Sequence, residues 1–377
     1  MTAQHIGIIL HDFSTGGSER IAIRLANAWA KAGRRVTLYC GTENGALRSL
    51  VSGDVAVSCC DPRIERSWIS RVRLALRLAG GIRADQPDIV FVPGNYHLLV
   101  VAVLARLRFV KRPLFVCKLS NPVRSRHGPG LMTKVGEWLT RWALAPVTAF
   151  TAMSPALRAQ ALYVFTQHPI YDLAEPVLDD DLPPLTVVSH SDEPAKIICA
   201  GRQAPQKDFA LALTAFSLID LAHDARLVIY GEGPLQSDLT ALANDLGISA
   251  RVHFAGYVRD LRPHLAGAKL FLMTSQFEGY PAVLIEALAA GVPIVTTDCS
   301  PAITEIVSSS QLGEVVSMRD PRVIAAAIER RLSVDTPNHD FLIASTELHR
   351  MAKASRAYLD RFDALSDAAI SGSSRQS

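Results

Sequence analysis

The stretch Glu278-Gly-Tyr-Pro-Ala-Val-Leu-Ile-Glu286-Ala-Leu-Ala-Ala-Gly291 decides how this sequence of 377 residues is interpreted. Pro281 stands where the first residue of a helix is expected and Gly291 just past its end, so Glu278 is expected in the preceding loop. The residues around Glu286 are apolar on all sides, which is typical of a buried helix. A lone carboxylate there is unfavourable unless something compensates it, so we expect a polar ligand at this helix.

The spacing of the two carboxylates narrows the kind of ligand. They flank the free N–H groups at the start of the helix, where the positive end of the helix dipole favours a phosphate. A ligand with hydroxyls at both ends and phosphates between them would use all three features, and a nucleotide sugar has this chemistry. The alternative is that Glu278 only interacts favourably with the helix dipole and that the Glu286 side chain reaches solvent.

Length and composition predict two well-packed domains. The chain is 49% hydrophobic with a mean hydropathy of +0.18, and 377 residues exceed one ordinary core. Strand-like runs alternate with helical patterns, which is typical of α/β units with a parallel sheet. The runs of the first half are His5–Leu10, Val36–Cys40, Val55–Cys59, Asp88–Pro93, Leu114–Lys118 and Val147–Met153, and those of the second are Lys196–Ala200, Arg226–Tyr230, Arg251–Ala255, Leu270–Thr274, Pro293–Thr296 and Glu314–Ser317.

The pattern therefore predicts two Rossmann-like, doubly wound domains that face each other across a cleft. We expect the first over residues 1–190, with a linker rich in Pro, Asp and Ser from about residue 170, and the second over 191–345. A helix at 346–365 is expected to cross back to the first domain. Residues 366–377 are expected to form a disordered tail.

The cellular compartment is predicted to be the cytoplasm. The chain starts with neither a basic leader nor a long apolar run, and no segment approaches eighteen uninterrupted apolar residues. Six cysteines show no CxxC or Cys/His cluster, so buried reduced thiols are expected, and neither a metal nor a cofactor.

Net charge is divided unevenly. Residues 1–190 carry 22 Lys and Arg against 14 Asp and Glu, or +8, and the remainder carries 17 against 22, or −5. Much of the basic excess lies close to apolar residues such as Trp138 and Trp142, a mixture that suits an anionic membrane surface or a phosphorylated acceptor. A peripheral position on the cytoplasmic face of the membrane follows as one alternative, and an ordinary solvated face as the other. No nucleic-acid-binding motif accompanies the charge, so nucleic acid is not an expected partner.

Ligands of open α/β sheets bind in the loops at the carboxyl ends of strands. After the first strand, Gly16-Gly17 opens a helix and lets the backbone approach a phosphate or sugar, although Ser18 as an N-cap would also explain it. After the first strand of the second half, Arg202 and Lys207 would neutralise a diphosphate, or be two surface cations near a turn. Gly231-Glu-Gly-Pro234 is compatible with another turn that faces the ligand, or with plain turn chemistry.

In this order and spacing, the motifs resemble those of the retaining glycosyltransferases of family 4, which have the GT-B fold. The similar pieces are Gly16-Gly17-Ser18-Glu19-Arg20, Gly201-Arg202 through Lys207-Asp208-Phe209, Val228-Ile-Tyr-Gly231-Glu-Gly-Pro, Val252-His-Phe-Ala-Gly256-Tyr-Val, and Ser275-Gln-Phe-Glu278-Gly-Tyr-Pro through Glu286-Ala-Leu-Ala-Ala-Gly-Val-Pro. The first half matches more loosely, as acceptor domains of this family vary.

The resemblance implies a role for each matched position. Arg202 and Lys207, with Gly201 in the same loop, would hold the donor diphosphate. Glu278 would bind hydroxyls of the transferred sugar and Glu286 those of the ribose. Further donor contacts are implied for the base-facing loop at Gly256 and Tyr257, for the helix start at Gly279, Tyr280, Pro281, Val283 and Leu284, and for Gly16 and Gly17 of the other domain.

The implied reaction is metal-independent transfer of a sugar, with a UDP-sugar as the expected donor, to a saccharide or polyprenyl-linked acceptor in polysaccharide or glycan assembly. The new bond forms on the same face through an oxocarbenium-like state, and the departing phosphate takes the acceptor proton. Paired carboxylates also occur in glycosidases, but the separation that assigns their stereochemistry is not available from a sequence.

The first half departs from the family pattern at the acceptor side. His97 and Asn95 are both candidates for the residue that faces the sugar, and His97 is carried forward as a catalytic candidate. Lys118 and Asn121 resemble an acceptor-side loop, while the usual Asn-Pro-Val near the linker is replaced by Glu175-Pro-Val. Two other functions stay open: a GT-B nucleotide-sugar epimerase and a catalytically silent partner subunit.

Overall fold

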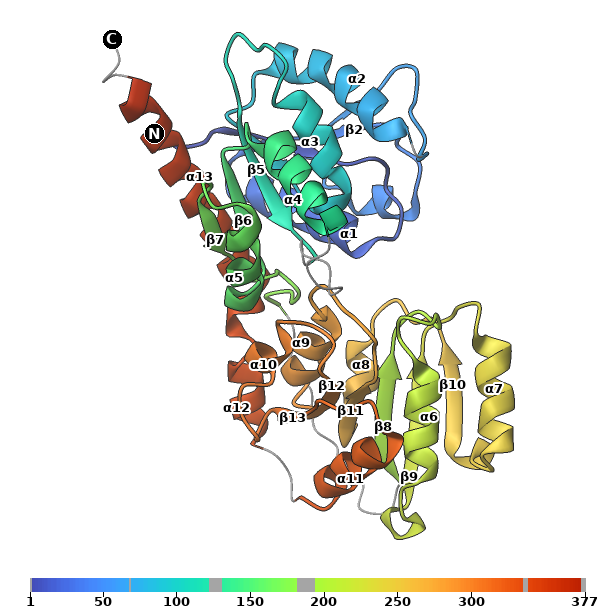
Figure 1. Cartoon of the computed structure of the whole chain (residues 1–377). Helices are drawn as coiled ribbons and strands as arrows, with labels where there is room; N and C mark the ends of the chain where they lie inside the picture. The colour runs from blue at the N-terminus through green and yellow to red at the C-terminus, as the bar shows by residue number, and fades with distance from the viewer. Residues whose placement is uncertain (1, 68, 122–130, 182–193, 335–337, 374–377) are drawn as a thin grey trace. The chain divides into compact units, whose positions relative to one another are not determined.

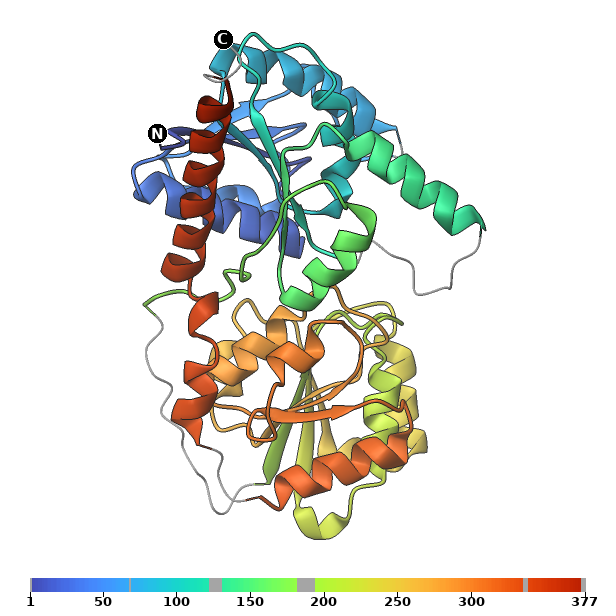
Figure 2. The same cartoon turned by 60° about the vertical axis from the view of Figure 1, so that its left-hand side comes forward.

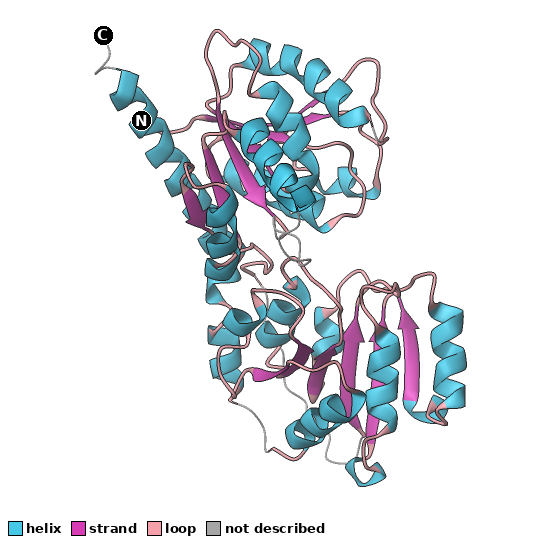
Figure 3. Cartoon of the chain, viewed as in Figure 1, coloured by secondary structure: helices cyan, strands magenta, loops and turns pink. Residues whose placement is uncertain are grey.

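The computed structural model describes residues 2–67, 69–121, 131–181, 194–334 and 338–373. The chain divides into two compact units, described separately below: unit 1 contains Met1–Asp180 and His349–Ser377, and unit 2 contains Asp181–Leu348. Figure 1 labels the elements and Figure 3 shows that each unit is a twisted sheet with helices packed on it. This is the α/β architecture predicted from the alternating pattern.

Unit 1 contains a seven-stranded parallel sheet in the order β3-β2-β1-β4-β5-β6-β7. The strands are β1 (His5–Ile9), β2 (Arg35–Cys40), β3 (Ala56–Cys59), β4 (Ile89–Val92), β5 (Leu114–Leu119), β6 (Ala149–Ala152) and β7 (Ile170–Asp172). The helices are α1 (Gly17–Lys31), α2 (Ser70–Asp85), α3 (Leu98–Leu104), α4 (Leu131–Leu144), α5 (Pro155–Val164) and α13 (Met351–Ser373), with short 3-10 turns η1 (Ala46–Leu50) and η2 (Asn95–His97).

Unit 2 repeats this design with a six-stranded parallel sheet in the order β10-β9-β8-β11-β12-β13. Its strands are β8 (Ala195–Ala200), β9 (Ala225–Tyr230), β10 (Val252–Gly256), β11 (Leu270–Met273), β12 (Ile294–Thr297) and β13 (Gly313–Val316). Its helices are α6 (Phe209–Ser217), α7 (Gln236–Asp245), α8 (Arg262–Leu265), α9 (Ala282–Ala289), α10 (Ile303–Ile306), α11 (Pro321–Leu332) and α12 (His339–Ala344), with 3-10 turns η3 (Leu221–His223) and η4 (Ser249–Arg251) and, at the unit boundary, η5 (Glu347–His349).

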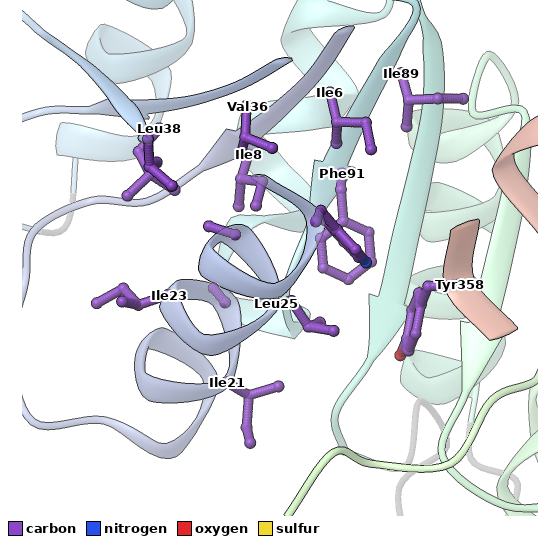
Figure 4. Packing of buried hydrophobic residues seen from close by; sticks show 14 of the residues in the cluster. Ile6, Ile8, Ile21, Ile23, Leu25, Val36, Leu38, Ile89, Phe91 and Tyr358 are labelled. Carbon is purple, nitrogen blue, oxygen red and sulfur yellow. The ribbon is translucent and has the colours of Figure 1, made fainter. Parts of the chain in front are cut away.

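The central strands are apolar because both of their faces are covered. All five residues of β1 and all four of β4 are buried, as expected for parallel strands between two helical layers. Figure 4 shows Ile6, Ile8 and Phe91 of the sheet packed against Leu25 of α1 and Tyr358 of α13. Burial on both faces explains why the strand runs could be located from hydrophobicity alone.

The carboxyl-terminal helix α13 belongs to unit 1. The Trp29 ring lies 5.2 Å from that of Phe362 and 5.5 Å from that of Phe91, and Arg34 forms a 2.7 Å ion pair with Asp363. These contacts hold the helix against α1. The expected disordered tail from residue 366 is wrong over 366–373, because α13 continues to Ser373; residues 374–377 lie outside the described part.

The expected linker from about residue 170 is also wrong at its start. Residues Ile170–Asp172 form β7, which pairs with Phe150–Ala152 of β6 at the sheet edge. A strand of three residues is too short to produce a clear alternation of apolar and polar positions, which is why its pattern was overlooked. Most of the rest of the expected linker, residues 182–193, lies outside the described residues.

Strand order reverses direction between β1 and β4 in unit 1 and between β8 and β11 in unit 2. At such a switch point the loops after the two strands diverge and leave a crevice at the carboxyl edge, where ligands of open sheets bind. The loops after these four strands carry Gly16 and Gly17, Asn95 and His97, Arg202 and Lys207, and Glu278. Each switch point is therefore the place to look for a site.

Candidate functional site

The switch point of unit 2 brings Lys207 and Glu278 into direct contact. Lys207 follows β8 and Glu278 follows β11, and the Lys207 Nζ and Glu278 Oε1 atoms are 2.6 Å apart. The hydroxyl of Ser275 donates to the same Oε1 atom at 2.7 Å. Their side chains remain 19% and 10% exposed. A cation and a carboxylate that were selected on separate motifs thus form one cluster that solvent, or a ligand, can reach.

Local backbone geometry explains the position of Lys207. Gly201 has φ +150°, and a Cβ atom at this residue would lie 2.9 Å from Lys207 Cε, so glycine allows the lysine stem to lie against the loop. Asp208 accepts from the Leu211 N–H and is the N-cap of α6. Lys207 consequently lies in the loop, directly before the N-cap of the helix.

Arg319 is a residue that the sequence analysis missed. Its guanidinium donates to the carbonyl oxygens of Ser275 at 2.7 Å and Thr274 at 3.1 Å, and it pairs with Asp208 at 2.5 Å. It thereby joins the loop after β8, which carries Lys207, to the loop after β11, which carries Glu278. Arg319 follows β13, so the rule that directs attention to loops after strands could have found it.

Arg202, the second predicted cation, is exposed, and no ion pair or hydrogen bond of its side chain occurs within the described residues. Its neighbour Gln203 is buried and donates to the Gly231 carbonyl at 2.7 Å. Gln203 fixes the loop on the β9 turn while the arginine stays in solvent. An exposed, unpaired guanidinium is suited to a ligand phosphate.

The prediction that helix α9 is buried on all sides was wrong. Leu284, Ile285, Ala287 and Leu288 are buried, whereas Ala282, Val283, Glu286 and Ala289 are only half-buried. These four lie three and four residues apart and share one helix face. Glu286 is on this open face, so its carboxylate does not need a buried partner, and small neighbours leave space beside it.

The start of α9 differs by one residue from the prediction. Pro281 has φ −80° and ψ 79° and is the N-cap, so the helix begins at Ala282. The N–H of Ala282 donates to Tyr280 O at 2.9 Å, and that of Leu284 to Pro281 O at 3.0 Å. Two of the N–H groups at the helix start, which were expected to be free for a phosphate, therefore already have local acceptors.

The loop before α9 is held by the loop after β12. The Glu278 N–H donates to Cys299 O at 2.8 Å, and the Ser300 hydroxyl donates to Gly279 O at 2.7 Å. Burial, and secondly the charge of Glu278, raise the pKa of Cys299 to about 11, so this thiol is protonated at neutral pH. It is unsuited to act as a nucleophile beside Glu278.

Gly256 and Tyr257 lie at the end of β10. Gly256 has φ +72° and its carbonyl accepts from Gly231 N–H at 2.7 Å, which ties this loop to the β9 turn. The Tyr257 side chain is 63% exposed. An exposed ring on a fixed loop is suited to lie against a flat ligand such as a base.

At the switch point of unit 1, Gly16 and Gly17 have different local roles. A Cβ atom at Gly16 would lie 2.0 Å from a carboxylate oxygen of Glu19, whereas one at Gly17 would meet nothing within 4 Å. Gly16 is the N-cap of α1 without a side-chain cap. It allows Glu19 to fold back, and only Gly17 faces open space.

Glu19 belongs to an ionic cluster beneath this loop. Arg66 contacts both Asp12 and Glu19 at 2.5 Å, and its guanidinium lies 4.8 Å from the Tyr96 ring centroid. Burial favours the neutral form of Asp12, but the hydrogen bonds from Arg66 and Ser14 and the charge of Arg66 together outweigh it and lower the pKa of Asp12. The cluster keeps the glycine loop close to the β4 loop.

His97 lies in the same region and is 1% exposed. Burial, and secondly the nearby His11, lower the pKa of His97 to about 3, so the ring is neutral. Neither ring nitrogen of His97 or His11 has a hydrogen-bond partner among the described residues. The rings of both histidines contact Tyr96 edge-on. Unsatisfied buried imidazoles are unusual, and they keep His97 a candidate for contact with a substrate.

The acceptor-side residues behave differently. The Asn95 amide donates to Asn121 O at 3.0 Å and accepts from Ser120 N–H at 2.8 Å, so it fastens the β4 loop to the β5 loop. Lys118 is 1% exposed and binds both carboxylate oxygens of Glu175. A buried, fully paired lysine cannot contact an acceptor, so this prediction was wrong. Asn121 is exposed and directly precedes the undescribed residues 122–130.

Two kinds of feature are absent from the described residues. No helix among them has both the length and the apolar character that crossing a bilayer requires. No three or more His, Cys, Asp or Glu side chains gather there in an arrangement that could hold a metal ion. All six cysteines are free thiols.

Two doubly wound sheets, with a cationic loop and a carboxylate-bearing helix start at one switch point, define a glycosyltransferase of the GT-B fold. A family model described as "Glycosyltransferase Family 4" matches residues 15–168, and one described as "Glycosyl transferases group 1" matches residues 194–333. The chain belongs to glycosyltransferase family 4, as its motifs predicted.

Relatives and solved structures agree with this assignment. The lipopolysaccharide core biosynthesis glycosyltransferase LpsE of Rhizobium meliloti is 24% identical over 85% of this chain and 86% of its own length. The lipopolysaccharide outer core galactosyltransferase WaaB in its apo form superposes with a TM-score of 0.72 at 17% identity, covering 94% of this chain and 98% of WaaB. HepE of Anabaena, in complex with UDP and glucose, superposes with a TM-score of 0.68 at 15% identity. The match covers 99% of this chain and 100% of HepE. At these identities the structural matches establish the GT-B fold.

Proposed function

We propose that this glycosyltransferase transfers a sugar from a UDP-sugar, with retention of configuration, to a saccharide or polyprenyl-linked acceptor in surface polysaccharide or lipopolysaccharide assembly. The observation that carries the proposal is the contact between Lys207 and Glu278 beside the open face of α9. It combines a cation for phosphate with a carboxylate for sugar hydroxyls. The LpsE and WaaB relatives support this acceptor class, and the HepE complex supports UDP.

The proposed donor arrangement assigns each group by its chemistry. Arg202, exposed and unpaired, and Lys207 bind the diphosphate, and Glu278 binds hydroxyls of the transferred sugar. Glu286, on the open face of α9, binds the ribose hydroxyls, and Tyr257 lies against the base. Binding of the diphosphate draws Lys207 partly away from Glu278, because the ammonium group then serves two anions.

In the proposed reaction the bond between the sugar C1 and the β-phosphate oxygen breaks, and a bond from C1 to the acceptor oxygen forms on the same face. The acceptor proton moves to the departing phosphate oxygen. Lys207 and Arg202 stabilise the negative charge that develops on this phosphate, which is the electrostatic contribution that usually dominates. These two cations take the place of a metal ion in the proposed mechanism. Because the phosphate accepts the proton, no protein nucleophile is required.

We assign the chain to the cytoplasm, with a lipid-linked acceptor presented at the cytoplasmic face of the membrane. Six free thiols support a reducing compartment.

The test is the melting temperature with UDP, GDP or ADP at millimolar concentration in the presence of a chelator. A ligand at about a hundred times its dissociation constant adds roughly 2.7 kcal/mol of stability. We expect a shift with UDP that the chelator does not abolish. A shift with GDP or ADP alone would overturn the donor, a shift only without chelator would overturn metal independence, and no shift at all would favour a silent subunit.

A further inference from the structure

The helix α4 of unit 1 presents its apolar side to solvent. Val135, Trp138, Leu139 and Trp142 are 50%, 62%, 49% and 60% exposed. They are spaced three, four and seven residues apart, so they form a single stripe on the helix. We call these four residues the α4 stripe. A helix of a soluble protein normally turns such a stripe toward the hydrophobic core of its domain.

The side of α4 that faces unit 1 is the less apolar one. Between residues 134 and 144 only Leu144 is buried, and Glu137, Thr140 and Ala143 are half-buried. The contrast with α1 is direct, since its apolar positions Ile21, Leu25 and Trp29 are buried in the core. Figure 2 shows α4, drawn in green, extending away from the body of unit 1. The stripe therefore contributes nothing to the core of this unit.

The orientation of α4 is held by interactions at its carboxyl end. Arg106 donates to the carbonyl oxygens of Trp142 and Ala143, and its guanidinium lies 4.5 Å from the Trp142 ring centroid. Arg141 donates to the Tyr163 carbonyl at 2.6 Å. With its end anchored on both sides, the helix cannot rotate the stripe inward without losing these bonds.

The surroundings of the stripe are basic. Helices α2, α3 and α4 pack side by side on one face of the sheet (Figure 1). Together α2 and α4 carry six Arg or Lys against two acids, Asp85 and Glu137. On α2, Arg73 and Arg77 are exposed beside Val72 and Leu76, which are 41% and 56% exposed. The same mixture of exposed apolar and cationic side chains thus continues along this face.

We propose that this face of unit 1, with the α4 stripe at its centre, docks on an anionic lipid bilayer. Tryptophan rings favour the interface between headgroups and acyl chains, and exposed Arg and Lys side chains complement anionic headgroups. A second copy of the same face would bring like charges together, which disfavours self-association. The proposal goes beyond the proposed function, because it names the docking surface and does not depend on which nucleotide the donor carries.

Docking would give the stripe a use in catalysis. In an α/β sheet the connection after a parallel strand leaves from the carboxyl edge, where ligands bind, and the helix that follows runs back toward the opposite edge; α4 is the helix that comes after β5 in the chain. A bilayer in contact with α4 therefore lies next to the edge at which an acceptor of unit 1 would bind. A lipid-linked acceptor could reach that edge without leaving the membrane.

The experiment measures co-sedimentation of the full chain with vesicles of phosphatidylcholine, with and without 30% phosphatidylglycerol, at about 0.1 M salt. The parent is expected to bind the anionic vesicles and to show a blue shift of tryptophan emission. The variant Trp138→Ser/Trp142→Ser is expected to lower the partition coefficient by about tenfold or more. Arg73→Gln/Arg77→Gln is expected to reduce binding to the anionic vesicles only. A matched control is Leu221→Ser/Phe341→Ser, which replaces exposed apolar residues of unit 2 and should bind like the parent.

Unaltered vesicle binding by the tryptophan variant, or no binding by the parent, would overturn the proposal. Sedimentation velocity without lipid provides a further outcome. A dimer of the parent that is lost in the tryptophan variant would also overturn the proposal, because a second copy would then cover the stripe. The UDP melting shift is measured on the same variants. A shift retained without vesicle binding contradicts docking alone, and vesicle binding retained without any nucleotide shift contradicts the proposed donor alone.

Discussion

Each unit contains a lysine and a glutamate in direct contact near the carboxyl edge of its sheet, and the two pairs differ in solvent access. Lys118 and Glu175 in unit 1 are 1% and 9% exposed, whereas Lys207 and Glu278 in unit 2 are 19% and 10% exposed. Lys118 uses both carboxylate oxygens of its partner, but Lys207 contacts only Oε1 of Glu278. The two glutamates are about equally buried, so the difference lies at the lysine, which is enclosed in the first, closed pair and partly exposed in the second.

The surroundings of the closed pair explain what it does. Glu175 also accepts, through its carbonyl oxygen, from the His349 ring at 3.0 Å, and Leu178 pairs with Arg350 in an isolated bridge. The two chain segments at the border of unit 1 are therefore joined around the Lys118–Glu175 pair. The comparison teaches that charge and position on a strand do not separate a structural pair from one proposed to bind a ligand, whereas the solvent access of the lysine does.

The largest effect on stability is expected from breaking the closed pair. Lys118→Met leaves the Glu175 carboxylate buried without a partner, which should lower the free energy of unfolding of unit 1 by about 3–5 kcal/mol. Urea denaturation followed by circular dichroism measures this change. The double variant Lys118→Met/Glu175→Leu should recover much of it, since no charge is then left buried. Equal stability of the single and double variants would contradict the structural role.

The next largest effect is expected on catalytic activity, from breaking the contact between Lys207 and Glu278. Lys207→Ala removes the cation proposed to stabilise the leaving phosphate, and turnover should fall by about 10²- to 10³-fold. The loss of stability should be smaller than for Lys118→Met, because the Ser275 hydroxyl still donates to the Glu278 carboxylate. Steady-state transfer assays together with the UDP melting shift measure both. Transfer close to the parent rate would refute the assigned role.

A smaller effect, on the pH dependence of stability, is expected from His97, a buried imidazole that has no charged partner. His97 binds a proton in the unfolded chain below pH 6.5 but not in the folded one until about pH 3. Its contribution to stability is therefore fully present above pH 6.5 and declines as the pH falls toward 3. Between pH 7.5 and 5 the parent should lose about 2 kcal/mol more than His97→Phe. Urea midpoints at the two pH values measure this, and parallel losses would contradict it.

Much of the fold followed from the sequence, because parallel strands covered on both faces appear as continuous apolar runs. This rule located twelve strands, but it overlooked β7, whose three residues are too few for a pattern. It also treated residues 366–373 as a tail, although they continue α13. The amphipathic periodicity of that helix fades toward its end, where composition alone indicates disorder.

For the site, the sequence by itself determined the types of residue that gather at each switch point. A glycine loop follows β1, two cations follow β8 and Glu278 follows β11, the positions at which a phosphate and sugar hydroxyls are proposed to bind. Their order along the chain was enough to predict the family. Local rules of helix capping also located the boundaries of α9 to within one residue.

Only the tertiary structure decided which of these side chains are available. Lys118 and Lys207 are the same type of residue in the sequence. Lys118 is enclosed by β5, the 175–178 segment and α13, whereas Lys207 borders solvent. Arg319 acts on loops more than forty residues away in sequence, and α4 turns its apolar side outward although its periodicity equals that of a core helix. Solvent access and contacts between distant segments arise only when the elements pack, so no local pattern in the sequence could specify them.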